Sequence, residues 1–207
     1  TQPEVLAQLE AAGFAASGRP VINDVARFRD LTKWKYLPLL AELGIGPRIC
    51  AELPADYRAS AAWQTSKHSA RVSKDRKYIQ LYATNNNRGD YKDRRAIEKI
   101  TVEYIDNLES GVRSFFRIGY SLGRVCDGWL YCHDDSEEIL KSGMCKHRTP
   151  FSLPKEYHGP IVQAMQQLGV DVAHIEGLFK RDKLYVFDNN PYHTAHGGTL
   201  NRVTEAI

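Results

Sequence analysis

The stretch that most constrains this chain lies between residues 174 and 194 and reads HIEGLFKRDKLYVFDNNPYHT. Two short runs within it, residues 175–179 and 184–187, are rich in apolar and β-forming side chains. The polar sequence Lys-Arg-Asp-Lys between them is typical of a tight turn, and the second run stops at Asn-Asn-Pro. The pattern therefore predicts an antiparallel hairpin.

The predicted hairpin brings polar side chains together at one end. Glu176 lies near the start of its first strand, and Asp188 and Asn190 lie at the end of its second. Facing residues in an antiparallel pair come within roughly 5 Å, so these side chains are expected to converge. Clustered oxygens repel one another unless a hard cation lies between them, and Mg²⁺ takes such ligands. Spacing alone leaves a second interpretation open, in which the acidic residues of a surface hairpin face water.

Residues 168–191, LGVDVAHIEGLFKRDKLYVFDNNP, resemble the last core hairpin of the ATP-grasp superfamily. In that family one strand carries an acidic metal ligand, and the next ends in an acid-x-Asn-Pro run that carries two more. The resemblance implies that Glu176, Asp188 and Asn190 are metal ligands, with Asp188 in place of the commoner Glu. It extends over most of residues 18–191. It implies an α+β fold, namely a two-lobed ATP-grasp-like core whose antiparallel sheets clasp a nucleotide.

The composition is that of an ordinary globular protein. The chain has 207 residues, of which 43% are hydrophobic and 26% charged, enough for one substantial core or two small lobes. No apolar run approaches the roughly 18 residues of a membrane helix and no signal segment opens the chain, so we expect a cytoplasmic protein with no membrane partner. The net charge of +3 does not by itself indicate nucleic acid. A homo-oligomer is left open.

We expect three segments along the chain. Residues 1–50 would hold an N-terminal helix, an initial strand and a linker helix, and residues 51–106 would form the small lobe. Residues 107–207 would form the large lobe, with the metal hairpin and a C-terminal tail. The N-terminal domain common in the superfamily is expected to be absent or reduced to the first helix. Residues 51–77 carry no readable element.

A helical pattern covers residues 29–43, with its apolar side chains on one face and Gly44 as its stop. Pro38 lies inside the pattern and predicts a kink or a short first turn. The segment resembles the lysine-containing helix of the family. The resemblance implies a phosphate contact for Lys33 or Lys35.

A β-rich run at residues 77–83 leads into a turn-rich loop at residues 84–89 that holds one glycine. The family usually places a basic residue at the end of this strand and a glycine-rich loop after it, whereas this strand ends in Tyr-Ala. Lys77, Arg88 or Lys92 would therefore have to supply the phosphate contact.

A second strand is predicted at residues 100–106. In the family a strand of this kind passes beside the adenine, whose edge pairs with backbone groups between the lobes. The resemblance thus implies adenine contacts for Glu103, Tyr104 and Ile105. An ordinary half-buried strand is the alternative.

Two arginines share one face of the strand predicted at residues 111–120. Strand alternation places Arg113, Phe115 and Arg117 together, and burying two guanidinium groups requires an anionic partner. The planar fork of arginine binds phosphate or carboxylate through two hydrogen bonds. The resemblance implies that Arg113 and Arg117 meet phosphates or an acyl phosphate. An exposed face with salt bridges is the alternative.

The remaining elements complete the large lobe. We predict a turn at residues 127–128, a strand at 129–131, a loop with a short helix at 133–148, and an amphipathic helix at 154–168 that Gly169 ends.

The resemblance implies an ATP-dependent ligase with ATP and Mg²⁺ as cofactors. Its substrates would be a small-molecule or peptide carboxylate and an amine or thiol acceptor. Two other functions are weighed against it. A non-catalytic nucleotide-binding module would explain the missing strand-end lysine, and an RNA-binding domain would use basic residues 67–99 with Tyr78, Tyr82 and Tyr91 as stacking platforms.

Overall fold

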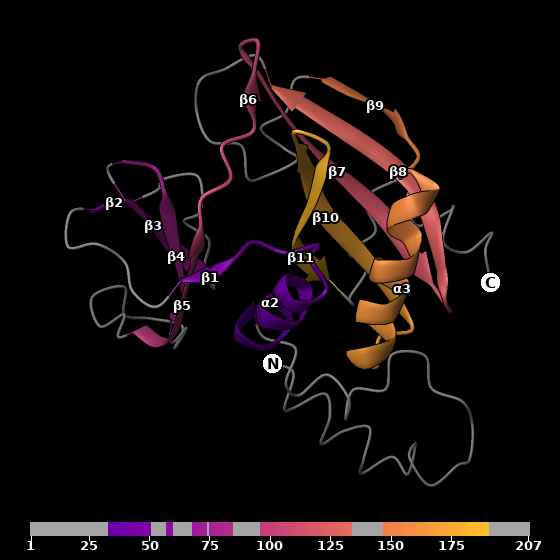
Figure 1. Cartoon of the computed structure of the whole chain (residues 1–207), viewed down its shortest axis with the longest axis horizontal. Coiled ribbons are helices and arrows are strands. Elements are labelled where there is room, and N and C mark those ends of the chain that lie inside the picture. The colour runs from indigo at the N-terminus through magenta and orange to yellow at the C-terminus, as the bar shows by residue number, and fades with distance from the viewer. Residues whose placement is uncertain are drawn as a thin grey trace, which may run out of the picture.

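The computed structural model describes residues 33–50, 57–59, 68–73, 75–84, 96–133 and 147–190. Within these residues the chain forms two antiparallel sheets with helix α2 (Lys33–Glu42) between their lower ends in the view of Figure 1. The elements predicted before residue 33, the loop that contains Arg88, and the tail after residue 190 lie outside the described residues. The α+β class predicted from the sequence is confirmed.

Helix α2 presents an apolar face to the core and ends at Gly44. Leu37 and Leu40 are fully buried, and Pro38 lies inside the helix. At the end of the helix, the Gly44 amide donates to Ala41 O at 3.0 Å and the Ile45 amide donates to Leu40 O at 3.0 Å. These two bonds form a Schellman motif, in which the residue after the helix takes a positive φ, here 73° at Gly44. The predicted stop is confirmed.

The small sheet has the strand order β1-β5-β4-β3-β2 in the described part of the chain. Its strands are β1 (Ile49–Cys50), β2 (Tyr57–Ala59), β3 (His68–Ser73), β4 (Tyr78–Thr84) and β5 (Ala96–Glu103). β4 matches the strand predicted at residues 77–83. β5 begins and ends earlier than predicted, and β2 and β3 lie in the region where the sequence showed no element.

The large sheet has the strand order β11-β10-β7-β8-β9, and β6 pairs with β7. Its strands are β6 (Leu108–Glu109), β7 (Val112–Ser121), β8 (Arg124–His133), β9 (His147–Phe151), β10 (Val172–Lys180) and β11 (Lys183–Asn190). The short helix η4 (Lys155–Tyr157) leads into α3 (His158–Gln167), which lies against the large sheet in Figure 1. Apolar side chains of α3 join the same core as those of the sheet, among them Ile161, Met165, Phe116, Ile118 and Ile175. Gly169 ends α3 as predicted, with a φ of 66°.

One prediction for the large sheet is wrong, and a second lies mostly outside the described residues. The predicted turn at residues 127–128 lies inside β8, and the connection from β7 is made at Leu122 and Gly123, both with positive φ. Gly128 is needed for close approach, since a Cβ there would lie 1.9 Å from Arg117 O on β7. Most of the loop with a short helix predicted at residues 133–148 lies outside the described residues, and its described ends belong to β8 and β9.

The segment that follows α2 is hydrogen-bonded to both sheets. Val186 of β11 donates its amide to Ile45 O at 2.6 Å. A few residues later, Glu103 of β5 donates its amide to Arg48 O at 2.9 Å, and Ile49 pairs with Val102. Residues 45–50 therefore connect the edge of the large sheet to the edge of the small one.

Candidate functional site

The β10–β11 hairpin holds the two predicted metal-binding carboxylates opposite each other. Its turn residues Arg181 and Asp182 have φ values of 48° and 60°, and positive φ at both positions is the mark of a type I′ turn. Further along the two strands from this turn, Glu176 pairs with Asp188, and His174 pairs with Asn190. The predicted approach of Glu176 to Asp188 is confirmed in the backbone register, whereas the approach of Glu176 to Asn190 stays a prediction. Their role as metal ligands stays a prediction.

A β-bulge decides which way Asp188 faces. The register shifts between Glu176 and Gly177, because Gly177 pairs with Val186 while Glu176 pairs with Asp188. Regular alternation would turn Asp188 to the same side as Val186, whose side chain is fully buried in the core. The extra residue, Phe187, reverses that alternation, so that Asp188 shares a face with Glu176.

Arg117 binds Glu176 directly. The two residues are opposite each other in the β7–β10 pairing, and the guanidinium donates two hydrogen bonds to Glu176 Oε1, one of them from Nε at 2.6 Å. Both side chains are largely buried, with 17% and 15% of their surface exposed. The anionic partner that the sequence requires for a buried arginine is therefore Glu176. Arg117 Cζ also lies 5.9 Å from the centre of the Tyr131 ring.

Tyr36 of α2 binds the other carboxylate. Its hydroxyl donates to Asp188 Oδ1 at 2.9 Å, and the Asn189 amide donates to the same oxygen at 3.1 Å. Burial raises the pKa of Tyr36 well above its usual value, and the charges of Asp188 and Glu176 raise it further. The hydroxyl is thus a donor. Sequence reasoning missed Tyr36, because a tyrosine on the apolar face of a helix looks like a core residue.

The donor set fits a hard divalent cation. Asp188 and Glu176 are carboxylates on one face of the hairpin, and each has one oxygen, Oδ1 or Oε1, hydrogen-bonded to another residue. Among the described residues, no three His, Cys, Asp or Glu side chains are grouped so that they could hold a metal ion. The third predicted ligand is an amide, Asn190, which stands at the end of β11 with an undescribed side chain. Oxygen donors of this kind are those that Mg²⁺ prefers.

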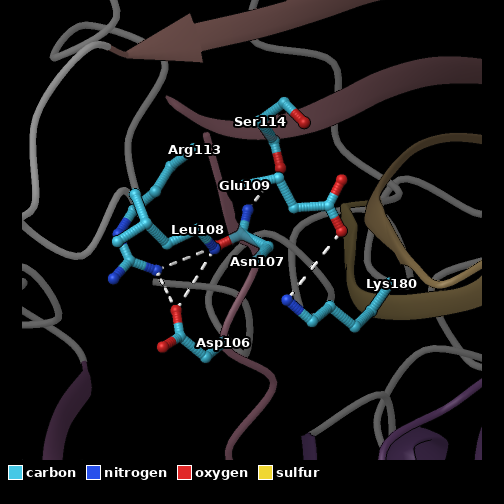
Figure 2. A network of polar contacts seen from close by, with 7 residues as sticks. All are labelled: Asp106, Asn107, Leu108, Glu109, Arg113, Ser114 and Lys180. Carbon is cyan, nitrogen blue, oxygen red and sulfur yellow. Dashed lines mark hydrogen bonds and ion pairs between the residues drawn. The ribbon is translucent and has the colours of Figure 1, made fainter. Parts of the chain in front are cut away.

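Arg113 is part of a different network, shown in Figure 2. Its Nη1 donates to Asp106 Oδ1 at 2.7 Å and to Asn107 Oδ1 at 3.2 Å, and the Asn107 amide donates to Ser114 O. The Arg113 side chain is 1% exposed. Asp106 and Asn107 belong to residues 104–107, which connect β5 of the small sheet to β6 of the large one. Arg113 therefore holds the connection between the sheets.

The pKa of Asp106 reflects this contact. Partial burial acts to raise it, but hydrogen bonds from Arg113 and from the Leu108 amide outweigh that effect, and the pKa lies below its ordinary value. Arg113 and Arg117 thus bind different carboxylates, although strand alternation places them on one face. The predicted contact of Arg113 with a phosphoryl group stays a prediction.

An aromatic cluster lies on the same side of the sheet as Arg117. The Phe115 and Tyr131 rings stack with their centres 5.1 Å apart, and Phe187 meets Phe115 edge-on at 6.5 Å. Trp129 and Leu178 pack against this cluster. The bulge at Phe187 therefore places an apolar surface directly beside the carboxylate of Asp188.

The predicted adenine contacts lie where the small sheet ends. Glu103 is the last residue of β5, and its Oε1 accepts from the Arg48 amide at 2.9 Å. Tyr104 and Ile105 follow it and are half-buried, and the Tyr104 amide donates to Lys77 O at 2.8 Å. Each has an ordinary structural environment. An adenine contact for them stays a prediction.

The predicted phosphate contacts are only partly described. Lys77 is exposed and its Nζ lies 3.4 Å from Asp75 Oδ2. Lys33 and Lys35 lie in the first turn of α2, one turn or less from Tyr36, and nothing is described of their side chains. Arg88 lies outside the described residues. The structure therefore brings together Arg117, Glu176 and Asp188, and it leaves the phosphate contacts as predictions.

Comparison with solved structures identifies the fold. The ATP-grasp ligase PsnB, complexed with a minimal precursor, Mg and ADP, superimposes with a TM-score of 0.55 over 88% of this chain at 14% sequence identity. The chain has an ATP-grasp-like fold. The macrocyclases MdnC, bound with the precursor peptide MdnA, and MdnB, both from Microcystis aeruginosa MRC, superimpose with TM-scores of 0.50 and 0.51 at 13% and 16% identity.

The match covers unequal shares of the proteins compared. The superposition takes in 88% of this chain for MdnC and 96% for MdnB, but only 60% and 64% of those chains, and 57% of PsnB. The chain therefore spans less than two thirds of the length of these ATP-grasp-like proteins. No protein-family sequence model matches it, and no curated protein sequence matches it significantly. None of the described helices is long and apolar enough to cross a membrane.

Proposed function

We propose that this ATP-grasp-like chain serves an ATP-dependent ligase that activates a carboxylate. The γ-phosphoryl group of ATP passes to the carboxylate, which gives an acyl phosphate and ADP. An amine or thiol then attacks the acyl carbon, and inorganic phosphate leaves. Because MdnC and PsnB are solved with precursor peptides, we further propose that the carboxylate belongs to a peptide.

The observation that carries the proposal is the pairing of Glu176 with Asp188 beside Arg117. In the proposed site Glu176, Asp188 and Asn190 hold Mg²⁺, which when bound would neutralise charge on the β- and γ-phosphates. Arg117 uses Nε and Nη2 to hold Glu176, and we assign its Nη1 to the transferred phosphoryl group. Phosphoryl transfer depends mainly on such positioning and charge stabilisation, and it needs no protein nucleophile.

The other predicted residues complete the proposal. Lys33 or Lys35, with Lys77 or Arg88, would contact the remaining phosphates. Glu103, Tyr104 and Ile105 would lie along the adenine. Arg113 would hold residues 104–107 in place, in addition to the predicted contact with the transferred phosphoryl group.

Calorimetric titration with ATP tests the nucleotide and metal part of the proposal. We expect heat of binding with Mg²⁺ and far less with EDTA. Asp188→Asn should weaken the Mg²⁺-dependent binding and leave the fold intact. Asp182→Asn is the matched control, because it makes the same change at the opposite end of the same hairpin, where the residue is exposed. Equal ATP affinity with Mg²⁺ and with EDTA would contradict the metal assignment.

ADP release tests the catalytic part. The chain would be incubated with ATP and Mg²⁺ and with panels of peptide and small carboxylates, each with an amine or thiol. Substrate-dependent ADP release is expected. ATP binding without ADP release from any pair would favour a non-catalytic nucleotide-binding module. RNA binding at submicromolar Kd and physiological salt, with no binding of ATP, would favour the RNA-binding alternative.

A further inference from the structure

We propose that Tyr36 is a positioning residue that fixes the metal-binding carboxylate of Asp188 from a different element of the fold. This inference rests on the proposed function, because it takes Asp188 as a Mg²⁺ ligand. Tyr36 lies on α2, 152 residues away from Asp188 in the sequence, and its hydroxyl donates to Asp188 Oδ1 at 2.9 Å.

Two donors converge on one oxygen of the Asp188 carboxylate. The Tyr36 hydroxyl and the Asn189 amide both donate to Oδ1, and these two bonds fix the orientation of the carboxylate. Glu176 is arranged in the same way, since both hydrogen bonds from Arg117 end on Oε1. Each carboxylate is therefore held through one oxygen by a donor from another element, β7 in one case and α2 in the other. Groups that orient a metal ligand in this manner contribute strongly to metal affinity.

The position of the Tyr36 hydroxyl is itself well determined. Tyr36 is only 2% exposed, and Leu37 and Leu40 of the same helix are packed in the core. The end of α2 is fixed by its Schellman motif, and Ile45 O accepts the amide of Val186 on β11. The hydroxyl donor and the strand that carries Asp188 are thus joined at two points. A ligand held in this way loses little conformational freedom when it binds a metal, which favours binding.

The test compares Tyr36→Phe with Tyr120→Phe. Both substitutions remove one hydroxyl from a buried tyrosine, and the Tyr120 hydroxyl is hydrogen-bonded to the backbone of Gly123. Tyr120 follows Phe116 and Ile118 on the face of β7 that packs into the main core, whereas Arg117 lies on the opposite face. The measurements are the Kd of Mn²⁺ in the presence of a non-hydrolysable ATP analogue, the Kd of that analogue in EDTA, and the melting temperature.

Tyr36→Phe is expected to raise the Kd of Mn²⁺ about tenfold or more and to leave the Kd of the analogue in EDTA unchanged. Tyr120→Phe should leave both constants unchanged. An unaltered Kd of Mn²⁺ in Tyr36→Phe would overturn the inference. So would an equal rise in both constants, since that would show a purely structural effect. If the unsubstituted chain shows no metal-dependent binding of the analogue, the proposed function fails first, and this outcome is distinct from the other two.

A second measurement keeps the hydroxyl in place and does not depend on the stability of Tyr36→Phe. With 3-fluorotyrosine introduced only at position 36, the fluorine resonance should shift when Mg²⁺ is added to the complex with the analogue. A resonance that does not move, while calorimetry shows that the metal has bound, would contradict a contact between Tyr36 and a metal ligand.

Discussion

Arg117 and Glu176 are opposite each other in the pairing of β7 with β10, and the same two residues are joined through their side chains at Oε1. The charge of the arginine compensates that of a carboxylate which would otherwise face Asp188, another acid, across the hairpin. One of the two carboxylates of the hairpin therefore has its charge compensated by a side chain of the fold itself. A buried ion pair of this kind costs free energy if either partner is removed.

Arg117→Ala should lower the turnover of the proposed ligase by roughly 10²- to 10³-fold, the size of effect seen when a group that stabilises transition-state charge is lost. ATP affinity should change less. Arg117→Lys should not restore activity, because an ammonium group cannot bind Glu176 and a phosphoryl group through a planar fork. Single-turnover ADP release measures the effect.

Arg148→Ala is the control for this prediction. Arg148 is an exposed arginine on β9 of the same sheet, and its Cζ stacks 4.9 Å from the centre of the Trp129 ring. The Arg148→Ala variant should keep the turnover of the unsubstituted chain. Similar losses in both variants would mean that the general positive charge of the sheet matters and that the position of Arg117 does not.

Arg113→Ala should lower the free energy of unfolding by about 3 kcal/mol, since it empties the space of a fully buried side chain and leaves Asp106 without its cation. Denaturant unfolding measures this change. Glu109→Gln is the control, because Glu109 forms an exposed ion pair with Lys180 at 3.8 Å beside the same network (Figure 2) and should alter stability by less than about 0.5 kcal/mol. Equal losses of unfolding free energy in the two variants would show that the buried ion pair of Arg113 stabilises the fold no more than the exposed pair of Glu109 does.

Asp106→Asn should lower the melting temperature at neutral pH and have less effect in acid. The folded-state pKa of Asp106 lies below its ordinary value, so its ionised form stabilises the fold above the unfolded pKa of about 3.9. That contribution is lost as the pH falls through the folded-state pKa. The difference in melting temperature between the two proteins should therefore shrink below about pH 4. A difference that stays constant down to pH 2 would contradict this assignment.

Gly128→Ala should destabilise the large sheet by about 1–3 kcal/mol or more, because its Cβ would meet backbone atoms of Arg117 and Ile118 at 1.9 and 2.7 Å. Gly159→Ala provides the comparison, since a Cβ at this position of α3 has no atom within 4 Å. It should be neutral or slightly stabilising, as alanine is a better helix former. Thermal unfolding of both variants measures the contrast.

The elements with strong local signals could be predicted from the sequence. The hairpin has a polar four-residue turn between β-rich runs, and both described α-helices end at a glycine that adopts positive φ, Gly44 and Gly169. The approach of Glu176 to Asp188 followed from the hairpin alone. These signals act over a few residues and need no knowledge of the partner element.

Features that depend on distant partners could not be predicted. Tyr36 binds a residue 152 positions away, and nothing near it in the sequence marks its hydroxyl as different from other core tyrosines. The sequence predicts a turn at Gly128 because glycine commonly marks turns, whereas the need for glycine comes from the backbone of β7. The carboxylate partner of Arg113 lies beyond the strand that carries it, in the connection between the sheets. Tertiary contacts decide all three.

The bulge at Phe187 also limits how this hairpin can change in length. Deletion of that one residue would restore simple alternation and leave Asp188 opposite Glu176, because Asp188 would then directly follow Val186. Insertion of one residue between the turn and Val186 would instead bring Phe187 opposite Glu176 and turn Asp188 to the other face. The hairpin can therefore accept the loss of its bulge residue, but the gain of a single residue between its turn and Val186 would separate the two acids. Natural shortening of β11 should occur at position 187, and lengthening should occur in steps of two.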